Sequence, residues 1–169
     1  MINTKGIIFD LRHYPNWTIY EICRFLSVDK QPFATFVKPD YSYPGTFHCD
    51  PPTTCGRKRH RRYAGKIVIL INEYTQSRGE FTAMALRTLP DAICIGSQTA
   101  GADGNVATIV FPGNCKVLMT SLGVYYPDGR QTQRIGLVPD IEIKPSIEGV
   151  RGQIDEVLER GIRYIETGK

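Results

Sequence analysis

One segment, Lys66–Leu89, constrains the fold more than any other part of the chain; it reads KIVILINEYTQSRGEFTAMALRTL. The apolar run Ile67–Ile71 has the length of a buried strand and is far shorter than the roughly 20 residues of a membrane span. Beyond Glu80, apolar residues recur at helical spacing: Phe81, Met84, Ala85 and Leu89. The pattern therefore predicts that Ser77 lies where a buried strand is followed by a helix.

Two roles are open to a serine in that position. Serine is a favoured N-cap residue, and Glu80 three positions later completes a capping box. A helix N-terminus also presents unpaired N–H groups and a partial positive charge. A hydroxyl placed there can attack a carbonyl while nearby N–H groups hold the oxyanion. The two roles are compatible, and the local pattern by itself favours the cap.

Length and composition are those of an ordinary soluble protein. A chain of 169 residues predicts one domain, residues 1–169, that needs no disulfide for its stability. The net charge is +4, with much of the basic excess in Arg57–Arg62. Such a run attracts phosphate, but no nucleic-acid-binding module or aromatic stacking array surrounds it. We therefore expect solvated surface there and no nucleic-acid partner.

The chain shows no phosphate-binding GxxxxGK[ST], no GxGxxG after a strand and no HExxH, and we expect no cofactor. Residues 1–5 lead directly into the strand-like GIIFD without an apolar leader or cleavage site. Either the protein is cytosolic or the chain is part of a longer protein. A buried-strand pattern so close to the start favours the second interpretation.

The five cysteines are an odd number, so at least one is unpaired: Cys23, Cys49, Cys55, Cys94 and Cys115. Cys94 lies in the apolar run AICIG and is expected to be a small buried hydrophobe. Cys49 and Cys55 flank a short loop and can bridge in an oxidising compartment. With His48 and His60 they can also be interpreted as zinc ligands, but the spacing matches no common zinc module.

The rest of the chain alternates between strand and helix patterns. Residues 38–62 show no clear period and are predicted to form a long, mobile loop, a length typical of functional or disordered segments. Residues 96–105 form a glycine-rich loop that either approaches a substrate backbone or simply connects two strands. The other predictions are strands at 6–9, 33–37, 92–95, 123–126 and 141–143, a hairpin at 106–111 and 116–120, and helices at 17–28 and 154–165. This order predicts a mixed α/β domain with a largely parallel core.

Six motifs in fixed order cover nearly the whole chain: GIIFDLRHYP, PGTF, GKIVILINEYTQSRGEF, IGSQTAGADG, PDGR and GLVPDIEI. In this order they resemble the catalytic core of the tail-specific, or C-terminal-processing, serine peptidases, the relatives of the tricorn core protease. The resemblance implies a ClpP/crotonase-like spiral of β-β-α units. It also places the family's nucleophile on Ser77 and an oxyanion donor on the backbone N–H of Arg78.

The chain departs from that family at the second oxyanion donor. Many members carry a Gly-Gly pair after the DxR strand, where this chain has Pro15-Asn16-Trp17. Proline has no N–H, so Tyr14, Asn16 or Trp17 would have to supply the second donor.

The general base is also missing from its expected places. Tail-specific members use a lysine in TxGKG, whereas this chain reads TAGADG over 99–104. The tricorn-like solution needs a histidine from an upstream segment and a carboxylate before GxxPD; this chain starts at the DxR strand and has amides at 131–134. Within the chain His13 is a candidate base, and Asp103 is either an orienting carboxylate or a turn residue.

The resemblance implies a serine peptidase core that is incomplete by itself and acts on peptide or protein substrates. The alternative is a non-catalytic relative that keeps the fold and binds peptides or glycan-linked ligands. No segment of the sequence is long and apolar enough to insert into a membrane. An extracytoplasmic location is implied by the resemblance alone, and the oligomeric state is not readable from the sequence.

Overall fold

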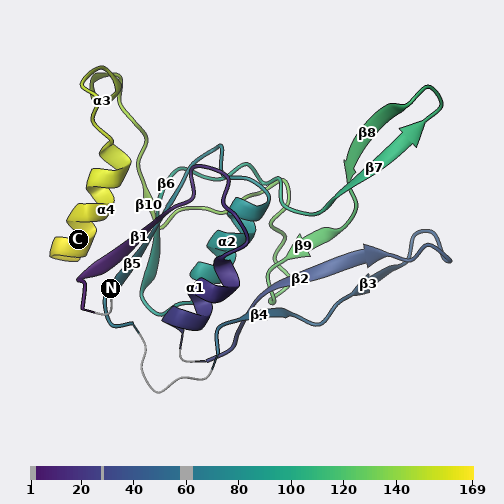
Figure 1. The fold of residues 1–169 in the computed structure, drawn as a ribbon, viewed down its shortest axis with the longest axis horizontal. Helices are drawn as coiled ribbons and strands as arrows, with labels where there is room; N and C mark the ends of the chain where they lie inside the picture. Colours follow the sequence, from purple (N-terminus) through teal and green to yellow (C-terminus); the bar gives the residue numbers. More distant parts are fainter. Residues whose placement is uncertain (1–2, 28, 58–62) are drawn as a thin grey trace.

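The computed structural model describes residues 3–27, 29–57 and 63–169. Its centre is a four-stranded parallel sheet in the order β1-β5-β6-β10 (Figure 1). The strands are β1 (Gly6–Asp10), β5 (Lys66–Ile71), β6 (Ala92–Gly96) and β10 (Ile141–Glu142). The predicted mixed α/β class with a parallel core is confirmed, whereas the spiral of β-β-α units stays a prediction.

Helices cover both faces of this sheet. On one face lie α1 (Ile19–Leu26) and α2 (Arg78–Leu86), and on the other lies α4 (Glu156–Thr167); a short helix α3 (Ile147–Arg151) precedes α4 (Figure 1). Burial on both faces explains why β5 is a continuous apolar run instead of an alternating one. Ile67, Ile69 and Ile71 pack toward α1 and α2, and Val68 and Leu70 pack toward α4.

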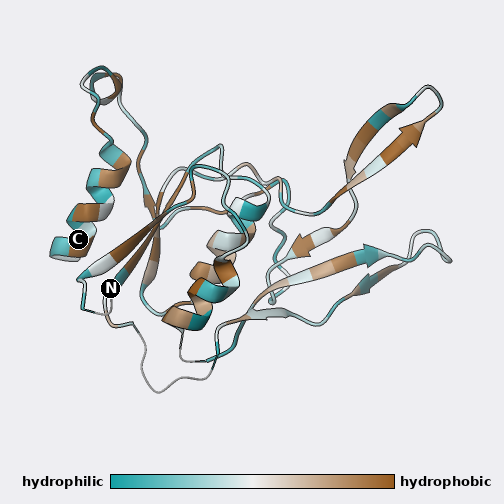
Figure 2. Cartoon of the chain, in the orientation of Figure 1, coloured by the Kyte–Doolittle hydropathy of each residue, from teal (hydrophilic) through white to brown (hydrophobic). Residues whose placement is uncertain are grey.

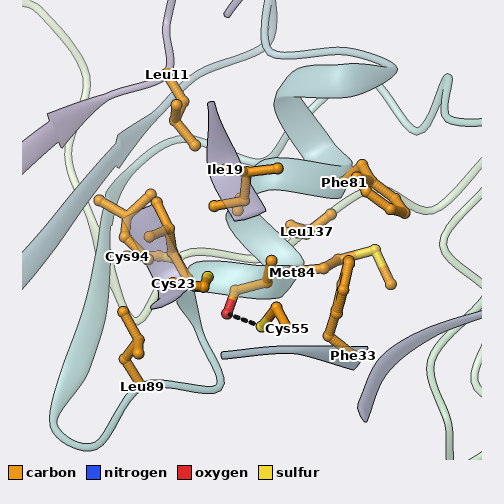
Figure 3. Packing of buried hydrophobic residues seen from close by; sticks show 14 of the residues in the cluster. Leu11, Ile19, Cys23, Phe33, Cys55, Phe81, Met84, Leu89, Cys94 and Leu137 are labelled. Carbon is orange, nitrogen blue, oxygen red and sulfur yellow. Dashed lines mark hydrogen bonds between the residues drawn. The ribbon is translucent and has the colours of Figure 1, made fainter. Parts of the chain in front are cut away.

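Helix α2 is enclosed on all sides, which the predicted amphipathic pattern did not anticipate. Every residue from Gly79 to Leu86 is buried. Figure 3 shows Met84 and Phe81 of α2 in one cluster with Ile19 and Phe33. The rings of Phe33 and Phe81 pack edge to face, with their centroids 4.7 Å apart. Because the body of α2 is buried in the core, the N-terminus of the helix is held in a fixed position.

A second, antiparallel sheet is built on the long strand β2 (Gln31–Pro39). It pairs with β3 (Phe47–Cys49), β4 (Thr53–Cys55) and β9 (Gly123–Tyr125). The prediction of an unstructured loop over residues 38–62 is therefore wrong for part of that range. Short strands such as β3 and β4 exist through pairing with a distant partner, which a periodicity search does not detect. Residues 58–62 lie outside the described residues.

A hairpin of β7 (Val106–Phe111) and β8 (Cys115–Thr120) projects from the body beside the β2–β3 arm (Figure 1). The sequence predicted this hairpin, and it is confirmed. In Figure 2 both its strands carry hydrophobic colours, as β5 and β6 do, although the hairpin side chains are exposed. Among the described helices, none is long and apolar enough to cross a membrane.

Candidate active site

Ser77 occupies the predicted junction between β5 and α2, with an unusual backbone. Its dihedral angles are φ 50° and ψ −118°, whereas an N-cap residue normally has extended geometry with negative φ. A non-glycine residue held in such a region costs about 1–3 kcal/mol and persists only where its surroundings enforce it. The backbone of Ser77 is therefore more strained than its role as an N-cap requires.

The group that enforces this geometry is the fully buried carboxylate of Glu80. Its Oε2 accepts the backbone N–H groups of Ser77 at 3.2 Å and Ala102 at 2.9 Å. Its Oε1 accepts the Thr99 hydroxyl at 2.5 Å and the Gly101 N–H at 2.8 Å. The predicted capping box is present, but the sequence signal revealed only the Ser77 half of this network.

The glycine-rich loop makes its close approach to the chain itself. Gly101 has φ +66°, and a Cβ there would lie 2.8 Å from the carbonyl carbon of Arg134. The Thr99 hydroxyl also accepts the Leu137 N–H at 2.7 Å. The loop is thus fixed between Glu80 and residues 134–137, and its Ala102 N–H shares the Glu80 Oε2 with the N–H of Ser77.

The loop after β1 lies over the first turn of α2. The buried hydroxyl of Thr75 donates to the Leu11 carbonyl at 2.9 Å. The Arg78 guanidinium carbon lies 4.0 Å from the Trp17 ring centroid and 5.2 Å from that of Tyr14, and its Nη1 donates to the Pro15 carbonyl at 3.4 Å. The loop expected to complete the oxyanion hole is therefore adjacent to Ser77.

Arg12 of the DLR motif anchors that loop to the opposite end of the chain. Its guanidinium binds the Asp155 carboxylate through two hydrogen bonds of 2.8 and 2.7 Å and also binds Asp10. The Arg12 hydrogen bonds hold the pKa of Asp155 below its usual value. Asp155 also accepts the Leu158 N–H and so caps α4, so α4 and the loop share one ion pair.

The two predicted partners of Ser77 lie in different hollows. His13 lines a hollow of about 500 Å³ together with Tyr14 and Gln76, and within the described chain no hydrogen bond joins its side chain to Ser77. Asp103 is only 6% exposed; its Oδ1 accepts the Gly104 N–H at 2.7 Å, and its Oδ2 has no hydrogen-bond partner among the described residues. Burial, with the Glu80 charge as a smaller cause, raises the pKa of Asp103 to about 7. The structure does not bring these two side chains together as a pair.

The segment that would carry a tricorn-like carboxylate holds an amide with a structural task. The Gln133 Nε2 donates to the carbonyls of Asp103 at 2.8 Å and Leu122 at 2.9 Å, and its Oε1 accepts the Val124 N–H at 3.3 Å. A carboxylate could not donate to those two carbonyls. Gln133 is therefore suited to joining the glycine-rich loop to β9.

The prediction that Cys94 is a small buried hydrophobe is confirmed, whereas Cys49 and Cys55 do not form the bridge that the sequence allowed. All five cysteines are free, with Cys49 exposed on β3 and Cys55 buried. The Cys55 thiol points into the core toward the Ala85 carbonyl, 3.7 Å away (Figure 3), so it does not bridge to Cys49. The His48 Nε2 forms a hydrogen bond of 2.7 Å with the Asp40 Oδ2, and His60 lies outside the described residues. In the described ranges no group of three or more His, Cys, Asp or Glu side chains is placed to hold a metal.

A cleft of about 1220 Å³, which we call the arm cleft, opens between the two antiparallel arms. One wall is a single face of the β3-β2-β9 sheet, and the other is the apolar face of the hairpin that carries Ala107 and Met119. The first wall includes Thr35, Val37, Pro39, Phe47, Cys49 and Tyr125. Its floor includes Ala102, whose N–H shares the Glu80 Oε2 with the N–H of Ser77. Ala102 thus connects the lining of the arm cleft to the Glu80 network that also holds Ser77, which is not itself a lining residue.

Comparison with known proteins gives a family match and one curated relative. The model of peptidase family S41 matches residues 2–143. A carboxy-terminal-processing protease from Bartonella bacilliformis is 38% identical over 105 residues, which are 61% of this chain and 24% of that protein. The chain thus spans about a quarter of the length of this relative.

Solved structures share the fold at low sequence identity. A candidate peptidase from Parabacteroides merdae superposes with a TM-score of 0.79 at 19% identity, over 95% of this chain and 52% of that one. CPAF in complex with lactacystin gives 0.76 at 16% identity, over 97% and 45% of the two chains. The tricorn protease gives 0.66 at 22% identity, over 98% and 15%.

Proposed function

The chain belongs to peptidase family S41, and on that premise we propose that it is the nucleophile-bearing core of a serine peptidase. Ser77 attacks the carbonyl carbon of a peptide bond and forms an acyl-enzyme that water then releases. The strained backbone of Ser77, at φ 50° and ψ −118°, is the observation that carries this proposal. A cap needs no such strain, whereas strained backbone clusters at active sites.

The oxyanion that forms is held by the backbone N–H of Arg78. Arg78 is the first residue of α2, so its N–H has no acceptor within the helix, and the helix dipole adds positive potential there. Removing one such donor in serine peptidases lowers kcat by about 10²–10³-fold. The Arg78 side chain is occupied with Trp17 and Tyr14, so its backbone and side chain have separate tasks.

Substrate polypeptide occupies the arm cleft in extended form. Its walls are apolar sheet faces, and open strand edges are suited to main-chain pairing with a peptide. The cleft floor at Ala102 meets the network around Ser77, which brings a bound chain to the nucleophile. An extracytoplasmic location is part of this proposal and rests on the family resemblance.

The base that accepts the Ser77 proton is the open part of the reaction. His13 and Asp103 are the titratable candidates within the chain, and neither forms a hydrogen bond to Ser77 in its described surroundings. We therefore expect the 169-residue chain by itself to show little or no peptidase turnover. Robust turnover that is lost in Ser77→Ala would contradict this expectation and would locate the base inside the chain.

The test of the nucleophile is covalent labelling. The protein in its full natural length should react with a fluorophosphonate probe at Ser77, identified by peptide mass spectrometry. The matched control is Ser42→Ala, an exposed serine in the turn between β2 and β3 that lies outside the lining of both hollows; it should label as the wild type does. Absence of labelling, or labelling that survives Ser77→Ala, would refute the proposal.

A non-catalytic, peptide-binding relative is the alternative, and the Gln133 amide favours it. That amide is built into backbone contacts where a tricorn-like site would carry a carboxylate. A histidine in the natural sequence upstream of β1 would favour the enzyme, and its absence would favour the binding protein.

A further inference from the structure

The family's usual second oxyanion donor has no counterpart at Pro15, because proline lacks an N–H. The Asn16 side chain is turned toward Thr18, whose N–H and hydroxyl its Oδ1 accepts at 3.2 and 2.7 Å, and among the described residues no hydrogen bond joins Asn16 or Trp17 to Ser77. A hydroxyl from the same loop does reach the site. The Tyr14 Oη lies 3.4 Å from the Ser77 Oγ and donates toward it.

We infer that the phenol of Tyr14 is the second oxyanion donor of this site, in place of a backbone N–H. The inference rests on the proposed serine-peptidase function. Tyrosine hydroxyls are among the side chains that serve in oxyanion holes. The assignment makes Tyr14 a catalytic residue, since its hydroxyl touches the reacting oxygen.

The length of the Tyr14–Ser77 contact supports this role. A ground-state O–H···O hydrogen bond is typically about 2.7–2.8 Å long, so at 3.4 Å the phenol is near the serine but weakly engaged by it. The oxyanion forms on a carbon bonded to Oγ and therefore develops next to the serine oxygen. A donor in that position can shorten its bond to the new charge, as catalytic hydrogen bonds do between the free enzyme and the transition state.

Arg78 keeps the phenol in place. Its guanidinium lies against the rings of both Tyr14 and Trp17 and donates to the Pro15 carbonyl. A cation held over an aromatic face is attracted by the negative potential of the ring. Tyr14 is 58% exposed and Trp17 61% exposed, so without this contact little else would fix either ring. Arg78 thus supplies one oxyanion donor, its backbone N–H, and its side chain positions the second donor, the Tyr14 hydroxyl.

The chemical step balances without proton transfer by Tyr14. The Ser77 Oγ bonds to the peptide carbonyl carbon as its proton leaves to the base, and the carbonyl π electrons move to oxygen. The Tyr14 O–H and the Arg78 N–H each donate a hydrogen bond to that oxygen. When the base returns that proton to the nitrogen of the departing amine and the carbonyl re-forms, both donors are unchanged.

The decisive variant is Tyr14→Phe, which keeps the ring over Arg78 and removes only the hydroxyl. The second-order rate of Ser77 labelling by a fluorophosphonate, measured on the protein in its full natural length, should fall about 10²-fold, in line with the loss of one oxyanion donor. Tyr74→Phe is the matched control, because Tyr74 lines the same hollow as Tyr14 and is 75% exposed. It should label within twofold of the wild-type rate.

A third variant separates the donor from a structural role. Arg78→Lys keeps the backbone N–H and a positive charge but loses the planar stack, so it should slow labelling less than Tyr14→Phe does. Tyr14→Phe labelling as fast as the wild type, while Ser77→Ala is not labelled, would overturn the inference and leave the nucleophile standing. A wild type that is not labelled at all would overturn the proposed function, and the inference with it.

Discussion

The β5 strand and the β7–β8 hairpin have similar apolar content and opposite surroundings. Val68, Ile69 and Leu70 have no exposed surface, whereas Val110 and Leu118 are 59% and 67% exposed. The first region is a two-sided core that ends at Ser77, and the second is a projecting ribbon that forms one wall of the arm cleft. The difference shows that the rigid part of the fold sets the position of the nucleophile, while the apolar arms are available for contact.

The strongest way to break this comparison is to truncate matched residues in the two regions. Leu70→Ala in β5 should lower the free energy of unfolding by about 4 kcal/mol, because a fully buried leucine loses its packing and leaves a cavity. Leu118→Ala in the hairpin should change it by less than about 0.5 kcal/mol. Urea unfolding followed by circular dichroism measures both. Equal losses would mean that the hairpin belongs to the cooperative core.

A second large effect is expected at Glu80. Glu80→Gln replaces an acceptor-only group with one that carries an NH₂, which must face N–H or O–H donors now bound by the carboxylate. We expect a loss of about 3 kcal/mol, since hydrogen bonds to buried charges contribute more than neutral ones. Labelling at Ser77 should slow as well.

The control for that variant is Glu21→Gln on the exposed surface of α1, where the carboxylate pairs with Arg24. An exposed pair of this kind contributes little, so the unfolding midpoint should stay close to that of the wild type. If Glu80→Gln behaved like this control, the buried network would not be what holds Ser77.

Asp103 should give the fold a pH dependence opposite to that of an ordinary ion-paired acid. Burial raises its pKa to about 7, so the folded state keeps a proton that the unfolded chain releases near pH 4. The unfolding free energy should therefore fall as pH rises from about 4 to 7 and level off above that. Asp103→Asn, which mimics the neutral acid, should exceed the wild type in stability by roughly 4 kcal/mol at pH 8, because about three pKa units at about 1.4 kcal/mol each separate the folded and unfolded states, and should match it at about pH 3. Parallel stability curves for the two proteins would contradict this assignment.

The smallest effect tests the strain itself. Glycine adopts positive φ at no steric cost, so Ser77→Gly should raise the free energy of unfolding by about 1 kcal/mol while abolishing labelling. Ser77→Ala should also abolish labelling but should not gain this stability. A destabilised glycine variant would show that the serine hydroxyl stabilises the fold by more than the strain costs.

The sequence predicted the parts of the fold that depend on local periodicity. The strand–serine–helix unit and the parallel core were readable because burial on two faces imposes continuous apolar runs, and the hairpin was readable from two strand patterns on either side of a turn sequence. Strands β3 and β4 were missed, since three-residue strands exist only through their pairing with β2.

The site was predictable to the extent that motifs named its residues. The S-x-x-E pattern indicated the capping box but not the Thr99, Gly101 and Ala102 bonds that make Glu80 the centre of the network. The contact between Tyr14 and Ser77 joins residues 63 positions apart, and no spacing rule connects them. Long-range hydrogen bonds of this kind become visible only once the chain is folded.

The ion pair between Arg12 and Asp155 has a practical consequence for anyone shortening this protein. The last helix looks dispensable, since it lies on the face of the sheet away from α2 (Figure 1). Asp155, however, has two roles: it caps the N-terminus of that helix, and it binds Arg12, two positions before Tyr14. A shortened protein that ended before residue 155 would therefore lose more than a packing layer. The loop that faces the nucleophile would also lose the ion pair between Arg12 and Asp155 that holds it in place.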